Sequence, residues 1–165
     1  MLRRIYAFAI AALVMVTLGT AAQSYRVQEA WSTAAGQAMG TGPVAIPMGD
    51  RLSWAAHDFG GLLHSYGALT TITLLIALLI AGAVARFSGH RSVVFGIAGA
   101  SAILLLLVGL EVELGTVGVF GARGAMGHAT QAVVGLLAAW LFARLTSARE
   151  RQSSILGRHF FRTRQ

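Results

Sequence analysis

The chain has 165 residues, of which 56% are apolar, and its mean hydropathy of +0.68 lies well above that of ordinary soluble domains. The absence of cysteine excludes disulfides, thiolate catalysis and cysteine-ligated metals. All 13 basic residues are arginine and the net charge is +7, but because their placement along the chain accounts for this charge, we do not expect a nucleic-acid partner.

Four apolar stretches occur along the chain, at residues 5–22, 66–85, 93–110 and 125–145. Each approaches the roughly 20 residues that a helix needs to cross a hydrocarbon core. Because backbone polar groups in lipid must be satisfied within their own segment, these stretches should be helices. The sequence therefore predicts an all-α integral membrane protein, with a four-transmembrane-helix domain at residues 1–145 and a basic cytoplasmic tail at residues 146–165.

The first stretch also has the features of a secretory signal peptide. Arg3 and Arg4 precede an apolar run that ends in the small residues Thr20, Ala21 and Ala22. The run is long for a signal peptide, and an uncleaved helix gives an even number of spans. We therefore expect a first transmembrane helix. If cleavage occurred, the mature chain would begin near Gln23 and keep three spans.

Residues 23–65 form the only sizeable segment between spans, which we expect to be an external loop. Gly40 to Gly49, with two prolines, is typical of irregular chain. Asp50 is a candidate N-cap for a helix that begins at Arg51. Apolar residues then recur at three-to-four spacing, at Leu52, Ala55, Phe59, Leu62 and Tyr66. This pattern predicts an interfacial amphipathic helix that bends into the second span at Gly60–Gly61 or at Gly67.

Small residues recur every fourth position in three of the spans, a spacing that lets helices in lipid approach closely. They are Thr73, Ala77, Ala81 and Ala85 in the second span, Gly96 and Ala100 in the third, and Gly127, Gln131, Gly135, Ala139 and Ala143 in the fourth. The fourth series is the longest. We therefore expect the fourth helix to occupy a central position in the bundle.

The distribution of arginine predicts the orientation, because short cytoplasmic loops are enriched in it. Ten arginines fall on one side of the predicted spans: Arg3, Arg4, Arg86, Arg91, Arg144, Arg149, Arg151, Arg158, Arg162 and Arg164. The other side has Arg26, Arg51 and Arg123, together with Glu29, Asp50, Asp58, Glu111 and Glu113. Both termini should therefore be cytoplasmic, in a bacterial inner membrane. The basic tail should lie against anionic lipid headgroups.

The last two spans resemble small four-helix inner-membrane proteins of proteobacteria that have no assigned function. The likeness runs from Ile103 to Leu110 and from Gly121-Ala122-Arg123-Gly124 to the segment Gly135-Leu136-Leu137-Ala138-Ala139-Trp140-Leu141-Phe142-Ala143. It covers the first external loop poorly and contains no catalytic motif. The resemblance supports the four-span topology and implies no activity, cofactor or site residue.

Ionisable and polar residues near the external side are the candidates for a ligand site. They are His64, His128, Gln131, Glu111, Glu113 and Arg123. Polar side chains within a span usually face the bundle interior, so we expect His128 and Gln131 to point inward. His57, His64 and His128 are the candidate metal or haem ligands, since His57 and His64, seven residues apart, would share one helix face. The alternative is that these histidines only form a polar face or an interhelical hydrogen bond.

No nucleotide, zinc-protease, hydrolase or haem-attachment motif is present. We therefore expect a non-catalytic structural, assembly or accessory protein that contacts lipid and either other membrane proteins or itself. The sequence requires no cofactor and leaves its nature open. The alternative function is an outward-facing binding or transport protein for a metal, haem or small anion. A membrane enzyme is a third possibility.

Overall fold

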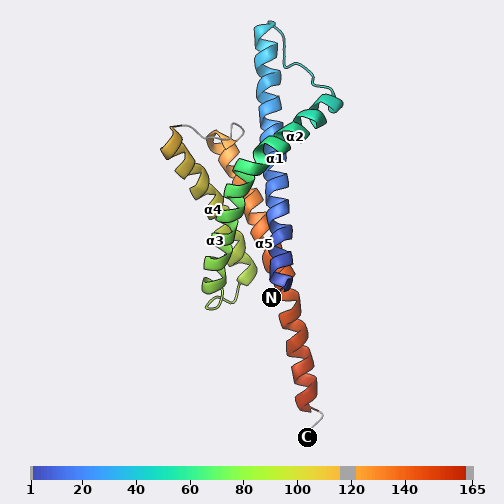
Figure 1. The fold of residues 1–165 in the computed structure, drawn as a ribbon, viewed down its shortest axis with the longest axis vertical. Coiled ribbons are helices and arrows are strands. Elements are labelled where there is room, and N and C mark those ends of the chain that lie inside the picture. The colour runs from blue at the N-terminus through green and yellow to red at the C-terminus, as the bar shows by residue number, and fades with distance from the viewer. Residues whose placement is uncertain (1, 116–121, 163–165) are drawn as a thin grey trace.

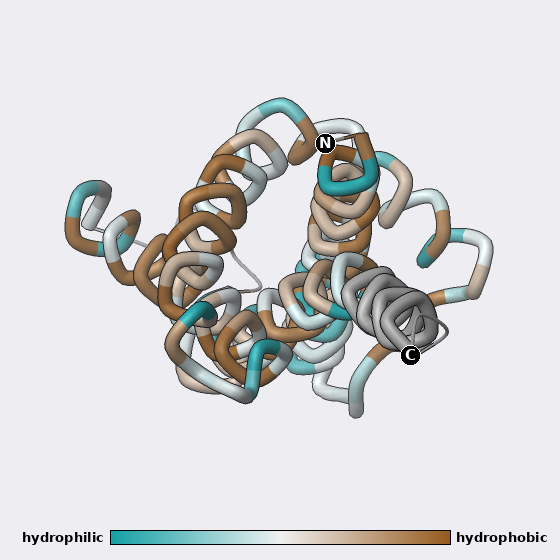
Figure 2. Tube along the Cα trace, turned by 90° about the horizontal axis from the view of Figure 1, so that it is seen from below, coloured by the Kyte–Doolittle hydropathy of each residue, from teal (hydrophilic) through white to brown (hydrophobic). Residues whose placement is uncertain are grey.

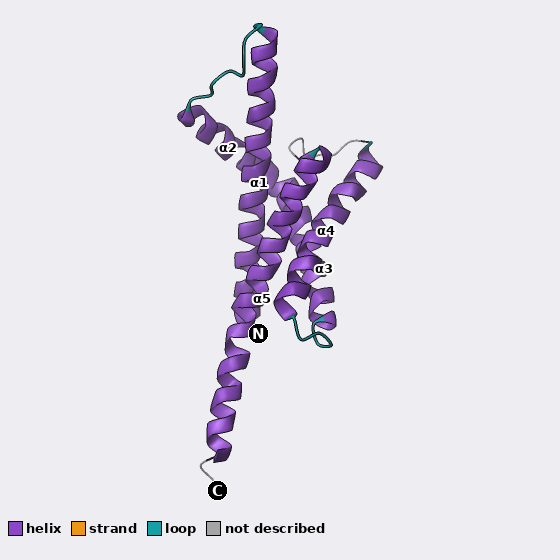
Figure 3. Ribbon diagram, turned by 180° about the vertical axis from the view of Figure 1, so that it is seen from behind, coloured by secondary structure: helices purple, strands orange, loops and turns teal. Residues whose placement is uncertain are grey.

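The computed structural model describes residues 2–115 and 122–162, and in this part of the chain every regular element is helical (Figures 1 and 3). The elements are α1 (Leu2–Ala38), α2 (Met48–Leu62), the π-helical turn η1 (Leu63–Gly67), α3 (Ala68–Val84), α4 (Arg91–Leu114) and α5 (Gly124–Arg162). Four helical segments are long and apolar enough to cross a membrane, namely Leu2–Ala38, Met48–Val84, Arg91–Glu113 and Gly124–Ser147. The prediction of an all-helical protein with four candidate spans is confirmed.

Helix α1 is much longer than a single membrane crossing requires. Its 37 residues correspond to about 55 Å, whereas the hydrocarbon core is about 30 Å thick. Residues 23–38, which we expected within a loop, continue the same helix and extend beyond the other helices (Figure 1). No glycine or proline interrupts residues 20–35, and one face of this stretch is buried. The helix ends before Gly40, whose φ of 67° reverses the chain.

Helix α2 begins earlier than predicted. Met48 is its first residue, and the backbone N–H of Arg51 already donates to the carbonyl of Pro47 at 3.0 Å. Asp50 therefore lies in the first turn and is not the N-cap, and no side chain caps this end. Pro47 is the N-cap of this helix, since its φ of −56° is compatible with entry into the first turn and its carbonyl accepts the first backbone hydrogen bond.

The bend between α2 and α3 falls on η1, which ends at Gly67, one of the two predicted positions. A π-turn changes the backbone hydrogen-bond pattern and leaves carbonyls that need other donors. The hydroxyl of Thr70 donates to the carbonyls of Tyr66 at 2.9 Å and Gly67 at 3.1 Å. This buried side chain therefore helps to stabilise the bend.

Helix α5 lies between α1 and α4 and packs against both. The predicted small-residue face of this helix is confirmed, because Gly127, Gln131, Gly135, Ala139 and Ala143 are all buried. The closest approach joins Gly135 to Gly99 of α4: a Cβ atom placed on Gly99 would lie 2.2 Å from the carbonyl oxygen of Gly135. Seen along the bundle, apolar residues cover the helices and hydrophilic residues gather at their ends and connections (Figure 2).

Most of the expected tail, residues 146–162, belongs to helix α5. Helix α5 continues without interruption past residue 145 to Arg162 and extends below the other helices (Figure 1). Arg164 lies outside the described residues. The boundary that we expected at residue 145 is therefore a change in composition within one helix.

Candidate functional site

A buried hydrogen-bond network at the centre of the bundle is built around Gln131 of α5. This residue is 2% exposed. The Tyr66 hydroxyl donates to Oε1 of Gln131 at 3.1 Å, and Nε2 of Gln131 donates to the carbonyl of Gly19 at 3.1 Å. One amide thus connects α1, η1 and α5, as the inward orientation predicted for Gln131 requires.

Glycine at position 19 is what allows this contact. A Cβ atom there would lie 3.2 Å from Oε1 of Gln131 and 3.7 Å from Cε1 of Tyr66. The π-turn contributes as well, since it includes Tyr66 and brings the ring into the bundle, where the residue is 4% exposed. Local backbone features on two helices therefore position the partners of a single buried amide.

A row of polar residues follows one face of α1 toward its C-terminal end. Thr20, Ser24, Gln28 and Ser32 occur every fourth residue and are all buried, and Gly36 continues the series. This spacing keeps them on one face of the helix. The sequence analysis missed the row, although its four-residue period could have been found by the same search that located the small residues in the later spans.

The polar row holds residues 39–47 and α2 against α1. Ser32 donates its hydroxyl to the carbonyl of Val44 at 2.7 Å, and the Val44 N–H donates to the Ser32 carbonyl at 3.1 Å. Gln28 donates from Nε2 to the Arg51 carbonyl at 3.1 Å. Gly36 is in such close contact with the returning chain that a Cβ atom would lie 2.2 Å from the carbonyl oxygen of Gly42.

Two further side-chain pairs join α1 to α2. Arg51 lies 3.4 Å from the carboxylate of Glu29, and both residues are partly exposed. The rings of Trp31 and Trp54 meet edge to face with centroids 5.4 Å apart. We call residues 23–62, which comprise the end of α1, the returning chain and α2, the external arm, because much of it extends beyond the other helices (Figure 1). Its contacts hold α2 and residues 39–47 against α1 as a helical hairpin.

His128 lies near the start of α5, at the rim of the bundle. Its Nδ1 lies 3.0 Å from the Gly124 carbonyl, and its Nε2 lies 4.0 Å from a carboxylate oxygen of Glu111 at the end of α4. The side chain is 19% exposed, compared with 55% for that of Glu111. His128 therefore faces α4, but it does not join the buried network around Gln131 one turn further along the helix.

The other predicted site residues are at the surface: His57, His64, Glu113 and Arg123 are exposed. Within residues 2–115 and 122–162, no group of three or more histidine and acidic side chains is close enough to hold a metal ion. The structure thus brings together His128 with Glu111, and Gln131 with Tyr66. It does not gather His57, His64 and His128 into a metal centre.

Comparison with known proteins identifies no relative that could assign a role to these residues. No family model matches the chain, and no curated protein or solved structure shows significant similarity to it.

Proposed function

We propose that the four candidate spans cross a bacterial inner membrane with both termini in the cytoplasm. The placement of charge in the fold supports this orientation. Arg3 donates to the Leu145 carbonyl, and Arg91 donates to the Thr146 hydroxyl at 3.1 Å, so the arginines of α1, α4 and α5 share one end of the bundle. The external arm and Glu111, at the end of α4, lie toward the opposite end (Figure 1). This asymmetry is the one expected for cytoplasmic arginines.

We further propose that the protein is a non-catalytic accessory or assembly component of the membrane that contacts another membrane protein or a second copy of itself. The observation that carries this proposal is the external arm. It extends beyond the length needed for one membrane crossing and is held in a defined shape by Gln28, Ser32 and Gly36. It also presents large exposed side chains, including Tyr25 and Leu52. Rigid extramembrane elements with such side chains are suited to protein contacts.

The alternative is an outward-facing binding protein that uses the residues around His128. The approach of His128 to Glu111 favours it. The two proposals predict different consequences of mutation, since the accessory role depends on the arm and the binding role depends on the rim of α4 and α5.

The test is affinity purification of the tagged full-length protein from membranes after chemical cross-linking, with Gly36→Ala and the control Gly49→Ala. A Cβ atom on Gly36 would clash with the backbone of Gly42, whereas one on Gly49 meets nothing within 4 Å. We expect Gly36→Ala to open the arm, to speed trypsin cleavage after Arg51, and to lose a partner that the wild type and Gly49→Ala retain in stoichiometric amount.

Two results would contradict the accessory role. One is retention of the same partner by Gly36→Ala although trypsin shows that its arm has opened. The other is a stoichiometric metal or chromophore in the purified protein that is lost in His128→Leu, which would establish the binding role instead.

A further inference from the structure

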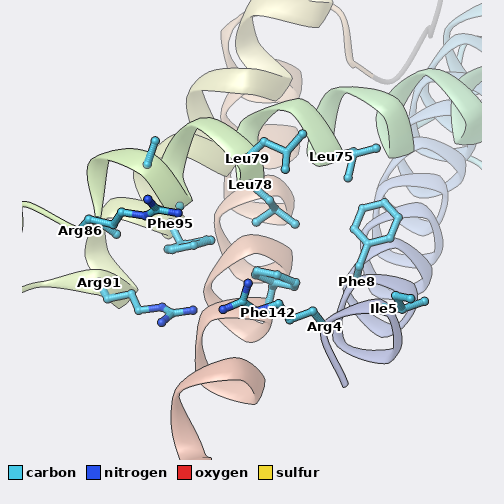
Figure 4. A pocket seen from close by; sticks show the side chains of 13 residues that line it. Arg4, Ile5, Phe8, Leu75, Leu78, Leu79, Arg86, Arg91, Phe95 and Phe142 are labelled. Carbon is cyan, nitrogen blue, oxygen red and sulfur yellow. The ribbon is translucent and has the colours of Figure 1, made fainter. Parts of the chain in front are cut away.

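A pocket of about 630 Å³ lies at the arginine-rich end of the bundle (Figure 4). It is lined by α1, α3, the first turns of α4 and Phe142 of α5. We propose that this pocket is a binding site for one anionic phospholipid, with the phosphate on the arginines and an acyl chain along α1 and α3. The inference rests on membrane insertion of the helices and is independent of the accessory role.

The polar part of the pocket consists of three arginines from three different segments. Arg4 comes from α1, Arg86 from the turn after α3, and Arg91 from the first turn of α4 (Figure 4). No acidic side chain is among the described residues that line it. Guanidinium groups donate paired hydrogen bonds to phosphate oxygens, so the charge and the donors both match a phosphodiester.

Arg91 is held in place before any ligand binds. Its guanidinium lies 5.4 Å from the centroid of the Phe95 ring, and its Nη2 donates to the Thr146 hydroxyl at 3.1 Å. Arg4 and Arg86 are exposed and can adjust to a ligand. The site therefore combines one fixed cation, which lowers the entropic cost of binding, with two mobile ones.

The remaining walls are apolar and explain why the ligand should be a lipid. Phe95 and Leu78 are buried at 2% and 6% exposure, while Ile5 and Leu79 are 62% and 68% exposed at the outer edge. A free phosphate would leave this apolar surface without a partner. An acyl chain would cover these apolar side chains and continue into the surrounding lipid.

The order of the lining residues along α3 also matches a phospholipid. Leu75 lies eleven residues before Arg86, which corresponds to about 16 Å along a helix, roughly half of a 30 Å hydrocarbon core. The arginines would thus lie at headgroup level and Leu75 near the bilayer midplane. The pocket therefore spans the depth of one leaflet.

Native mass spectrometry of the full-length protein in detergent tests the proposal with dioleoylphosphatidylglycerol, dioleoylphosphatidylcholine and inorganic phosphate as separate probes. We expect one phosphatidylglycerol per chain at concentrations where the other two probes do not bind. Arg4→Gln combined with Arg86→Gln should weaken binding about 25-fold, or about five-fold per arginine. The control Arg144→Gln removes one positive charge at the same end but outside the pocket, and should leave the affinity unchanged.

A second pair of variants tests the apolar part. A Cβ atom on Gly82 would lie 4.0 Å from Cζ of Phe95, so Gly82→Leu fills the pocket without a backbone clash and should abolish binding. Gly109→Leu, at a position where a Cβ atom meets nothing within 4 Å, is its control.

Four outcomes would overturn the proposal. They are equal binding of phosphatidylcholine, arginine-dependent binding of inorganic phosphate alone, equal loss in Arg144→Gln, and full binding by Gly82→Leu.

Discussion

Gln131 illustrates how a single polar residue can stabilise an apolar bundle. Burying an amide in an apolar environment is unfavourable unless its donor and acceptor both find partners. Here the oxygen accepts from Tyr66 and the nitrogen donates to Gly19, so both ends of the amide are used. Because the partners belong to different helices, the hydrogen bonds fix the relative position of α1, η1 and α5. The residue thus acts as a structural connector.

This arrangement predicts that Gln131→Leu destabilises the protein more than Tyr66→Phe. The first change removes both hydrogen bonds and leaves the buried Tyr66 hydroxyl without its acceptor, at a cost of about 1–3 kcal/mol. The second removes one interhelical hydrogen bond, which in membrane proteins averages about 0.6 kcal/mol. Denaturation in mixed micelles would measure both. The double variant, which also removes the orphaned hydroxyl, should be no less stable than Gln131→Leu alone; fully additive losses would show that the two side chains do not interact.

At the scale of the elements, the contact between α4 and α5 depends on two glycines. Gly99 and Gly135 face each other so closely that a Cβ atom on either would meet the backbone of the other at 2.2 to 2.5 Å. The small-residue spacing predicted Gly135 and the central position of α5. It did not identify Gly99, because the third span was matched at Gly96 and Ala100 and a single sequence does not show which of several small residues faces the partner helix.

We therefore expect Gly99→Ala to destabilise the protein, by about 1–3 kcal/mol, because the added methyl group forces the helix backbones apart. The control is Gly109→Ala in the same helix, where a Cβ atom meets nothing within 4 Å. Alanine favours helix formation by up to about 1 kcal/mol relative to glycine, so this control should be neutral or stabilising. Thermal unfolding in detergent compares the two. Equal stability would mean that Gly99 is not at the helix contact.

At the scale of the whole molecule, hydropathy predicted the four candidate spans. A helix that crosses a membrane needs about 20 apolar residues, and a run of that length is easily recognised in a single sequence. The continuation of α1 to Ala38 was missed, since residues 23–38 have polar character and are helical through contacts with α2 and residues 39–47. The site residues were harder to predict. Gln131 was recognised by its depth within a span, whereas its partners Tyr66 and Gly19 depend on how three helices come together.

The orientation of the whole molecule yields the last prediction, which the absence of cysteine makes straightforward to test. Ser53 lies on the exposed surface of α2 in the external arm, and Phe87, 94% exposed, lies in the turn between α3 and α4. If the arginine-rich end is cytoplasmic, a membrane-impermeant maleimide should label Ser53→Cys in cells whose outer membrane has been made permeable. Phe87→Cys should react only after the inner membrane is disrupted. The reverse labelling pattern would invert the proposed topology. Labelling of both variants in cells with an intact inner membrane would contradict the four-span arrangement, because α3 (Ala68–Val84), the last part of the second candidate span, lies between the two positions.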